Sequence, residues 1–292
     1  MTRSFSIFFL ILISFTTLLA QEEEPTMNVT SKEEMTLVFN KMEKAIKNVK
    51  SAKFRLVKKE RSNEKYSQFD ESIKQNVTPL NIYIKVSKGP IKGTEILYNT
   101  GQNEGKAYVK VSSFAPTVNL DPLGILINEK QRHTLFESGF AYSGYKIYET
   151  YQKFKEKPSE YAVYGGIVKW DNCDAYKFTL ENKDYKIKDY VLLDGEDIIK
   201  VADKLQLDEY TILELNPSIK NYTDVKVGQS ILIPSSFAKT VVVYIDAKSF
   251  LPVYQKITDS KGLVGEYEYH ELIINPIIPE EEFTKAYKGY SF

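Results

Sequence analysis

One stretch of this sequence, residues 190–234, restricts the possible folds more than any other. It begins with a short β-prone run and a turn, continues with two short amphipathic helices, and ends in a second β-prone run. Asp208 is placed to cap the second helix, and Pro217 ends it, because the residue before a proline is kept out of the helical region. The stretch therefore predicts the order strand, helix, helix, strand. In chain order its parts are 190–192, the turn Asp194-Gly195, the helix face Ile198, Val201, Ala202 and Leu205, the helix face Ile212, Leu213 and Leu215, and the strand 230–233.

These residues resemble a LysM module, a small domain that binds N-acetylglucosamine polymers such as peptidoglycan and chitin. The resemblance rests on Leu213-x-x-Asn216-Pro217 and on Val227-Gly228-Gln229-x-Ile231-x-Ile233-Pro234, which lie at the separation typical of the family. It implies a shallow glycan-binding groove between two loops. The residues that it assigns to this groove are Asp194, Gly195, Glu196, Asp197, Ile198, Asn216, Pro217, Ser218 and Ile219.

One position departs from the family pattern. Where the family has Gly-Asp-Thr or Gly-Asp-Ser after the first strand, this chain has Gly195-Glu196-Asp197. A carboxylate thus replaces a hydroxyl in a loop that the family uses for sugar, and like-charge repulsion would disfavour the carboxylates of peptide stems. The alternative to a binding module is a degenerate one that serves only as a folded spacer.

Strand-like runs lie on both sides of this stretch and predict an antiparallel meander. An amphipathic helix precedes them, since Ser31 and Glu34 form a capping box before an apolar stripe that ends near Val49. The predicted class is α+β, a curved antiparallel sheet packed on helices. The predicted strands are 52–58, 80–86, 93–99, 106–111, 163–164, 176–180, 240–246, 251–258 and 265–272, with a further helix at 145–154.

The simplest account of these runs is one sheet that the small module interrupts. The two end strands of the module would pair, which brings its ends to about one strand spacing, roughly 5 Å. A loop tip of the sheet accepts such an insertion. The predicted boundaries are a leader at 1–20, a first part of the host domain at 21–188, the module at 189–235 and a second part at 236–292.

The host domain has resemblances of its own. A helix before a long meander, with Asp246-x-x-x-x-Leu251-Pro252-Val253 in a late hairpin, is similar to the LolA/LolB-like lipoprotein-localisation fold. That resemblance implies an apolar cavity and a lipid or another apolar ligand. The host also resembles a bacterial family of exported proteins without an established activity. The motifs that carry this second resemblance are Pro79-Leu80-x-x-Tyr83, Pro90-x-x-Gly93-x-Glu95-x-x-Tyr98, Leu120-Asp121-Pro122 and Arg132-His133-x-x-x-Glu137-x-Gly139.

The N-terminus and the charge balance bear on location and partners. Arg3, an apolar run over 5–19 and Ala20 before Gln21 are typical of a secretory signal peptide, and no cysteine at the cut offers a lipid anchor. We therefore predict a periplasmic protein of a Gram-negative bacterium without a transmembrane anchor after signal cleavage. The 39 basic and 39 acidic side chains argue against a nucleic-acid partner. Cys173 is the only cysteine, and we interpret it as a small buried apolar residue.

The best catalytic constellation is Arg132, His133 and Glu137. On a helix, His133 and Glu137 would share a face, so that the carboxylate could orient the imidazole. The alternative is a structural ion pair between Arg132 and Glu137 beside a packed His133. The sequence has no G-x-S-x-G nucleophile elbow, and its second histidine, His270, is distant. We therefore predict no enzyme, no catalytic residues, no metal and no cofactor.

The sequence thus indicates an exported cell-envelope binding protein. Its module would bind peptidoglycan or another N-acetylglucosamine polymer, and its host domain a lipid or apolar ligand. Two alternatives stay open at this point. One is an envelope hydrolase that uses Arg132, His133 and Glu137, and the other is a structural scaffold with a degenerate module.

Overall fold

The computed structural model describes residues 29–62, 64–124, 127 and 131–292. The predicted leader, residues 1–20, lies outside the described residues. The helices are α1 (Lys32–Lys47), η1 (Asn103–Gly105), η2 (Leu135–Glu137), α3 (Phe140–Phe154), α4 (Pro158–Tyr161), α5 (Ile198–Leu205), α6 (Glu209–Leu215) and η3 (Glu280–Phe283). The strands are β1 (Ser51–Ser62), β2 (Lys65–Asn76), β3 (Asn81–Lys88), β4 (Glu95–Asn99), β5 (Ala107–Lys110), β6 (Val118–Leu120), β7 (Ala162–Trp170), β8 (Cys173–Glu181), β9 (Ile187–Val191), β10 (Ser230–Pro234), β11 (Thr240–Asp246), β12 (Pro252–Asp259) and β13 (Gly262–Ile274).

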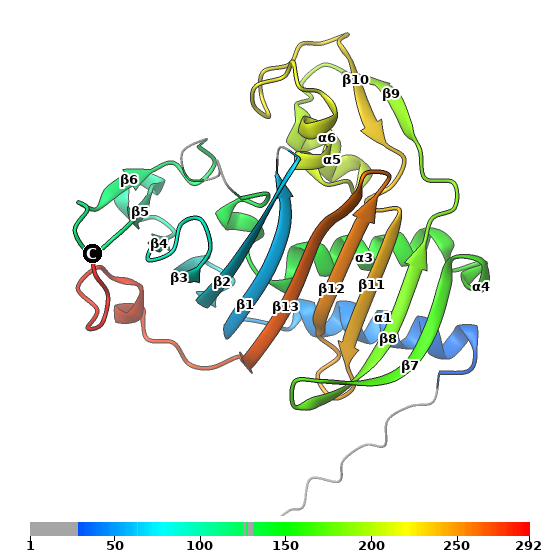
Figure 1. The fold of residues 1–292 in the computed structure, drawn as a ribbon, viewed down its shortest axis with the longest axis horizontal. Helices are drawn as coiled ribbons and strands as arrows, with labels where there is room; N and C mark the ends of the chain where they lie inside the picture. The colour runs from blue at the N-terminus through cyan, green and yellow to red at the C-terminus, as the bar shows by residue number, and fades with distance from the viewer. Residues whose placement is uncertain (1–28, 63, 125–126, 128–130) are drawn as a thin grey trace, which may run out of the picture.

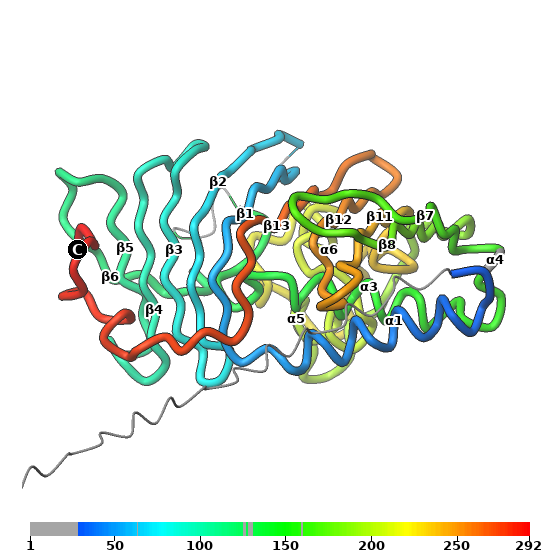
Figure 2. Tube along the Cα trace, turned by 90° about the horizontal axis from the view of Figure 1, so that it is seen from below, coloured from blue at the N-terminus to red at the C-terminus, as the bar shows by residue number. Residues whose placement is uncertain are grey.

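Eleven of the described strands form one antiparallel sheet, which we call the main sheet. Its order is β6-β5-β4-β3-β2-β1-β13-β12-β11-β8-β7, so the N-terminal meander and the C-terminal meander meet where β1 pairs with β13. Figure 1 shows α1 and α3 crossing one face of the sheet, and Figure 2 shows the same layer from below. The prediction of an antiparallel sheet packed on helices is confirmed.

The core of the main sheet is organised around α1. Ser31 and Glu34 form the predicted capping box, and the predicted apolar stripe of the helix is buried against the sheet. Phe39 stacks on Tyr151 of α3 at 4.1 Å between ring centroids and contacts Phe178 of β8 at 5.0 Å. An amphipathic helix, a second helix and the inner face of the sheet therefore share one core.

The chain leaves the main sheet after β8 and returns to it at β11. These strands are neighbours, and Glu181 pairs with Thr240 across the gap. Between them β9, α5, α6 and β10 form a unit with its own two-stranded antiparallel sheet and its own apolar cluster, which we call the βααβ unit (residues 187–234). Its neck is closed by the hydrogen bond from Asn182 N to Lys239 O, at 2.8 Å. In Figure 1 the unit lies beyond the ends of β1, β13 and β12.

Two local predictions were wrong. The predicted strands omit β2, a strand of 12 residues that pairs with β1 along its length. Residues 132–137 were expected on a helix, but Arg132 and His133 precede η2, a single turn that Thr134 caps with Glu137. The backbone N–H of Thr134 donates to Glu137 Oε2 at 2.8 Å, which favours a short capped turn over a continuing helix.

Candidate functional site

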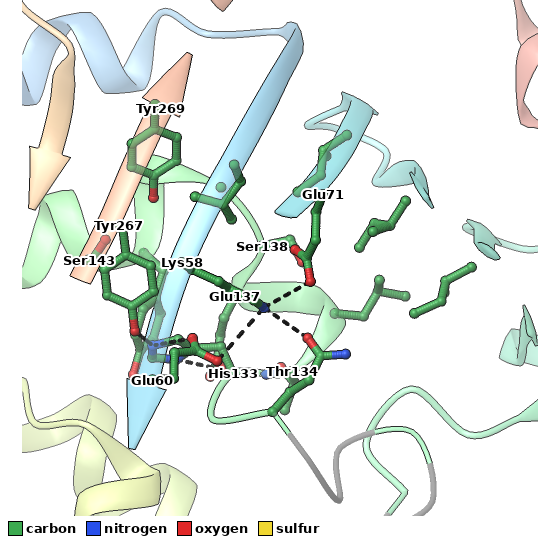
Figure 3. Close-up of a pocket in the computed structure, with 18 of the residues that line it drawn as sticks. Lys58, Glu60, Glu71, His133, Thr134, Glu137, Ser138, Ser143, Tyr267 and Tyr269 are labelled. Atoms are coloured by element: carbon green, nitrogen blue, oxygen red, sulfur yellow. Dashed lines mark hydrogen bonds and ion pairs between the residues drawn. The ribbon is translucent and has the colours of Figure 1, made fainter. Parts of the chain in front are cut away.

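A cluster of polar side chains lies on the inner face of the main sheet, under the segment that precedes α3 (Figure 3). Lys58 of β1 is almost fully buried and lies 3.3 Å from Glu71 Oε1 and 3.8 Å from Glu60 Oε2. Its ammonium group also donates to Gln131 Oε1 at 2.9 Å. A buried charge requires such partners, since an unpaired one costs several kcal/mol, on the order of 5. Lys58 therefore ties two sheet carboxylates to the overlying segment.

The protonation states in this cluster follow from burial and from these pairs. Burial lowers the pKa of Lys58, but Glu60 and Glu71 outweigh burial, so the pKa is raised overall. Burial raises the pKa of Glu71. For Glu60, burial is outweighed by Lys58 and His133, and the pKa of the carboxyl is lowered. The cluster thus favours the ammonium of Lys58 beside an ionised Glu60.

His133 is bound into the same cluster. Its Nε2 forms a hydrogen bond of 2.8 Å with the hydroxyl of Tyr267, and its Nδ1 lies 3.6 Å from Glu137 Oε2. Burial lowers the pKa of His133, but the nearby carboxylate of Glu137 and the charge of Glu60 raise it by more, so the net shift is upward. The predicted proximity of His133 and Glu137 is therefore real, although no helix produces it.

Arg132 does not pair with Glu137, and that interpretation was wrong. Its guanidinium, fully buried, donates to Asp208 Oδ1 of the βααβ unit at 2.8 Å and lies 3.7 Å from Glu214 Oε2. It also donates to Arg61 O at 3.0 Å. The reason is topological, since the insertion brings the start of α6 against the segment that carries Arg132. Of the three side chains in the candidate constellation, His133 and Glu137 thus lie together, but Arg132 is engaged with the unit.

The contact between the unit and the main sheet is a buried ionic junction. Arg61 of β1 donates to Glu214 at 2.9 and 3.2 Å and to Asp259 of β12 at 2.5 and 3.0 Å. Burial raises the pKa of Asp208, but Arg132 outweighs it and holds the pKa at about 2. Asp208 therefore remains charged at neutral pH, and the ion pairs of Arg132 and Arg61 fix the unit on the sheet.

Two further carboxyl groups, those of Glu209 and Glu137, lie beside this junction. Glu209, in the first turn of α6, is buried and accepts from the hydroxyl of Tyr142 at 2.6 Å. Burial and a hydrogen bond with Glu137 raise the pKa of Glu209 well above its usual range. For Glu137, burial is outweighed by the bonds to Glu209 and His133, and its pKa is lowered. Glu209 therefore keeps its proton to a higher pH than an ordinary carboxyl does, whereas its neighbour Glu137 ionises more readily.

The space that remains inside the cluster is small. The cavity measures about 30 Å³, enough for roughly one or two water molecules. It is too small for a sugar ring or an acyl chain. Within the part of the chain that the structure describes, no group of three or more His, Cys, Asp and Glu side chains is placed to hold a metal ion. The cluster is thus suited to holding the segment and the unit in place.

A much larger groove lies outside the cluster, where the βααβ unit meets the main sheet. Its volume is about 710 Å³, within the range of roughly 300–1,000 Å³ typical of small-ligand sites. The unit contributes α6 and the loop that follows, with the side chains of Tyr210, Leu213, Leu215, Pro217, Ile219 and Tyr222. The opposite wall comes from the host, with Glu64, Leu123, Gln131 and Lys261. Aromatic, aliphatic and polar groups thus face one concave space, which we call the junction groove.

The first predicted sugar loop does not line the junction groove. Glu196 accepts from Lys204 at 2.8 Å and from the Tyr190 hydroxyl at 2.9 Å. The bond with Lys204, followed by the backbone N–H of Leu193, lowers the pKa of Glu196 to about 2. Asp197 caps α5 by accepting from Lys200 N at 2.8 Å. Since Asp, Ser and Thr are all good N-caps, the carboxylate that departs from the LysM pattern can serve the same local purpose as a hydroxyl.

The other predicted residues of the two loops divide between the surface and the core. Asp194 and Gly195 are exposed at a turn, where the φ of +74° at Gly195 suits glycine. The side chains of Ile198 and Ile219 are buried in the apolar cluster of the unit. Pro217 and Ser218 are exposed. Of the nine predicted residues, Pro217 and Ile219 line the junction groove.

Asn216 has a structural use that its sequence position did not reveal. Its amide donates to Leu232 O at 2.8 Å and to Ile212 O at 2.7 Å, and its Oδ1 accepts from Leu232 N at 2.9 Å. The side chain thus occupies the edge of β10 as a neighbouring strand would. It fixes the end of α6, and with it one wall of the junction groove.

Replacing Asn216 with alanine should lower the free energy of unfolding by about 1–3 kcal/mol, because three hydrogen bonds are lost at about 0.5–1.5 kcal/mol each and part of the loss is offset by water. Urea denaturation followed by circular dichroism measures the change. The matched control is Ser218→Ala in the same loop, where an exposed side chain should change stability by less than about 0.5 kcal/mol. Equal effects of the two substitutions would contradict the strand-edge role of Asn216.

The groove residues missed by the sequence analysis come from distant parts of the chain. Glu64 follows β1, Leu123 and Gln131 flank the segment before α3, and Lys261 lies in the turn between β12 and β13. No local pattern joins these positions. Tyr210 and Tyr222 lay within the recognised stretch, Tyr210 on α6 and Tyr222 in the polar loop that follows, where an aromatic residue was the signal available.

Comparison with known proteins gives partial matches. Residues 49–187 match the model of a family described as "Protein of unknown function (DUF1571)". An endolysin of Bacillus phage B103 is 29% identical over 102 residues, which are 35% of this chain and 37% of the endolysin. This chain therefore spans little more than a third of the length of that curated relative.

Several solved structures have a related outline. The Mycobacterium tuberculosis lipoprotein LppX is 11% identical, with a TM-score of 0.40 over 85% of this chain and 99% of that one. LprF from Mycobacterium bovis is 13% identical, with a TM-score of 0.39 over 84% and 95%. The LolA superfamily protein NE2245 from Nitrosomonas europaea is 11% identical, with a TM-score of 0.32 over 85% and 96%. At these TM-scores the similarities say nothing about a ligand of this chain.

Proposed function

We propose that this protein is a non-enzymatic binding protein of the bacterial cell envelope, and that it binds an N-acetylglucosamine polymer in the junction groove. The observation that carries the proposal is the groove itself. Its volume of about 710 Å³ is walled by Tyr210 and Tyr222 and includes Pro217 and Ile219 from the predicted sugar loop. The LysM-like sequence pattern supplies the sugar class.

The chemistry of the groove suits a sugar chain. A pyranose presents an apolar face of C–H groups and a rim of hydroxyl and N-acetyl groups. Tyrosine rings offer large apolar surfaces with a polar edge, and a ring buried against such a face contributes about 1–2 kcal/mol. Gln131 and Asn221 offer amide groups to the polar rim. Polar groups placed among apolar and aromatic side chains are typical of small-molecule sites, where they fix the orientation of the ligand.

The ionic junction favours binding by keeping both walls in place. Arg132 joins Asp208 to the host segment, and Arg61 joins Glu214 to β12. A ligand that contacts both walls therefore has no hinge motion to restrict on binding. Such preorganisation reduces the entropy cost of association.

The same contacts support a role without catalysis. Arg132 is engaged by Asp208 and Glu214, and His133 by Tyr267. The cavity beside them has no room for a sugar ring. Each member of the candidate triad thus has a structural use, and the groove that fits a ligand lies elsewhere.

The proposed location is the periplasm, on the basis of the predicted leader. None of the described helices is long and apolar enough to cross a membrane. Lipid or apolar-ligand binding by the host domain stays a prediction from the resemblance, and the cavity inside the polar cluster gives it no support.

Co-sedimentation of the full chain with purified peptidoglycan and with chitin tests the proposal. Replacing Tyr222 with alanine should weaken binding roughly tenfold, because one aromatic wall of the groove is lost. A point substitution is preferable to deletion of the unit, since deletion would leave Arg61 and Arg132 without carboxylates from α6.

The matched control is Val191→Ala, on the exposed outer face of β9 and outside the residues that line the groove. It should bind as the natural sequence does. Thermal denaturation of both variants shows whether the unit still folds. A protein that stays in the supernatant with both polymers would contradict the proposed function.

A further inference from the structure

The two walls of the junction groove each carry a lysine. Lys220 comes from the loop after α6, and Lys261 from the turn between β12 and β13. Neither ammonium group forms an ion pair with another described residue, whereas Glu214, at the base of the same groove, is held by Arg61 and Arg132. Glu64 also lines the groove. Among the described residues that line the groove, two lysines without an ion pair thus stand against one such carboxylate, that of Glu64.

The acidic residues expected to repel carboxylates lie elsewhere. Glu196 is bound by Lys204 and Tyr190, and Asp197 caps α5. Asp194, Glu196 and Asp197 are all absent from the residues that line the groove. The prediction that the first loop disfavours anionic ligands therefore does not apply to the junction groove, where the free charge is positive.

We propose that the junction groove selects glycans that carry carboxylates over neutral N-acetylglucosamine polymers, through Lys220 and Lys261. This inference rests on the proposed function and names its substrate class. In peptidoglycan every second sugar bears a lactyl group whose carboxyl is free where the peptide stem has been removed and is otherwise amide-linked to a stem that carries carboxylates of its own, whereas chitin is uncharged. Because Lys261 belongs to the host, the main sheet sets part of the selectivity of the inserted unit.

The size of the selectivity follows from the exposure of the lysines. A solvent-exposed ion pair contributes about 0.2–1 kcal/mol, so two pairs give a preference of about twofold to thirtyfold. We expect about fivefold. Because exposed pairs are screened by salt, the preference should shrink as ionic strength rises.

Isothermal titration calorimetry of the full chain with two soluble hexasaccharides tests this inference. One probe is chitohexaose, and the other alternates N-acetylglucosamine with N-acetylmuramic acid whose lactyl carboxyls are free. The natural sequence should bind the second probe about fivefold more tightly. In Lys220→Gln/Lys261→Gln the two affinities should become equal, mainly because binding of the acidic probe weakens. The matched control is Lys226→Gln, an exposed lysine of the unit that does not line the groove, and its preference should be unchanged.

The possible outcomes separate the two proposals. Binding of both probes without a preference, or with a preference for chitohexaose, overturns the selectivity and leaves the proposed function in place. A preference that persists in the double variant overturns the role of the lysines, since the shape of the lactyl sugar would then explain it. Binding of neither probe overturns the proposed function, and the selectivity with it.

Discussion

Replacing Arg132 with methionine should lower the free energy of unfolding by about 3–5 kcal/mol, the cost typical of removing one partner from a buried ion pair. The side chain is fully buried and pairs with Asp208 at 2.8 Å. Methionine fills much of the same volume but leaves Asp208 buried without its cation. Glu214 keeps Arg61, so most of the penalty should come from Asp208.

The same substitution should loosen the βααβ unit from the main sheet. The unit has its own apolar cluster and a closed neck, whereas Arg132 reaches it from the host segment. Urea denaturation should therefore show two transitions in place of one, because the unit and the sheet no longer unfold together. Limited proteolysis should find new cuts near the neck, at residues 182–186 and 235–239.

A matched control separates burial from charge. Lys169 pairs with Asp174 at 2.7 Å, but 83% of its side chain is exposed. Lys169→Met should therefore cost less than about 1 kcal/mol. If Arg132→Met unfolded in a single urea transition and lost as little free energy of unfolding as Lys169→Met, the buried network would not be what holds the unit.

The sequence predicted those elements whose apolar residues follow one clear period. The stripe of α1 and the order of the βααβ unit were visible because their buried positions are apolar and their ends carry caps. The pairing of β8 with β11 follows the same logic, since strong strands flank the inserted stretch. These predictions required only local patterns.

β2 was missed because the polar cluster interrupts its pattern. Its inward positions include Glu71 and Gln75 beside Phe69 and Ile73, all of them buried. Glu71 can lie there because Lys58 of β1 is at 3.3 Å. A strand that buries charge cannot be recognised from its own residues, since the partner that permits the burial lies on another strand.

In the candidate site, too, the residues within a local sequence pattern were predicted, and those that depend on distant parts of the chain were not. The sequence assigned Pro217 and Ile219 to a sugar groove between two loops of the module, and in the structure both line the junction groove instead. It assigned Asp197 and Asn216 to sugar binding, but in the structure one caps a helix and the other occupies a strand edge. Lys261 could not be found, because only the docking of the unit on the sheet brings its turn to the groove.

Replacing Glu209 with glutamine should make the protein more stable than the natural sequence at alkaline pH, and about equally stable near pH 5. The folded pKa of Glu209 is raised by burial and by Glu137. A group whose pKa is raised on folding contributes stability fully below its unfolded pKa, about 4.3, and loses that contribution as pH rises through the folded pKa. Glutamine does not titrate, and it can donate to Glu137 and accept from Tyr142 as the protonated acid does.

Other groups of the cluster do not obscure this difference. The pKa of Glu137 is lowered, so its contribution is present above its unfolded pKa and is lost only as pH falls. His133 and Glu71 have raised pKa values, and their contributions also decline with rising pH. Because both proteins keep these three groups, the difference between them reports mainly on Glu209.

Urea denaturation of both proteins at intervals between pH 5 and pH 9 measures the effect. The gap in the free energy of unfolding should grow with pH at up to about 1.4 kcal/mol per pH unit, the slope for one proton, and should level off above the folded pKa of Glu209. The matched control is Glu160→Gln, whose side chain is 53% exposed in a pair with Lys157, and its gap should stay constant. A constant gap for Glu209→Gln as well would mean that folding does not raise the pKa of Glu209, and the ionic junction would then hold the unit without help from a protonated Glu209.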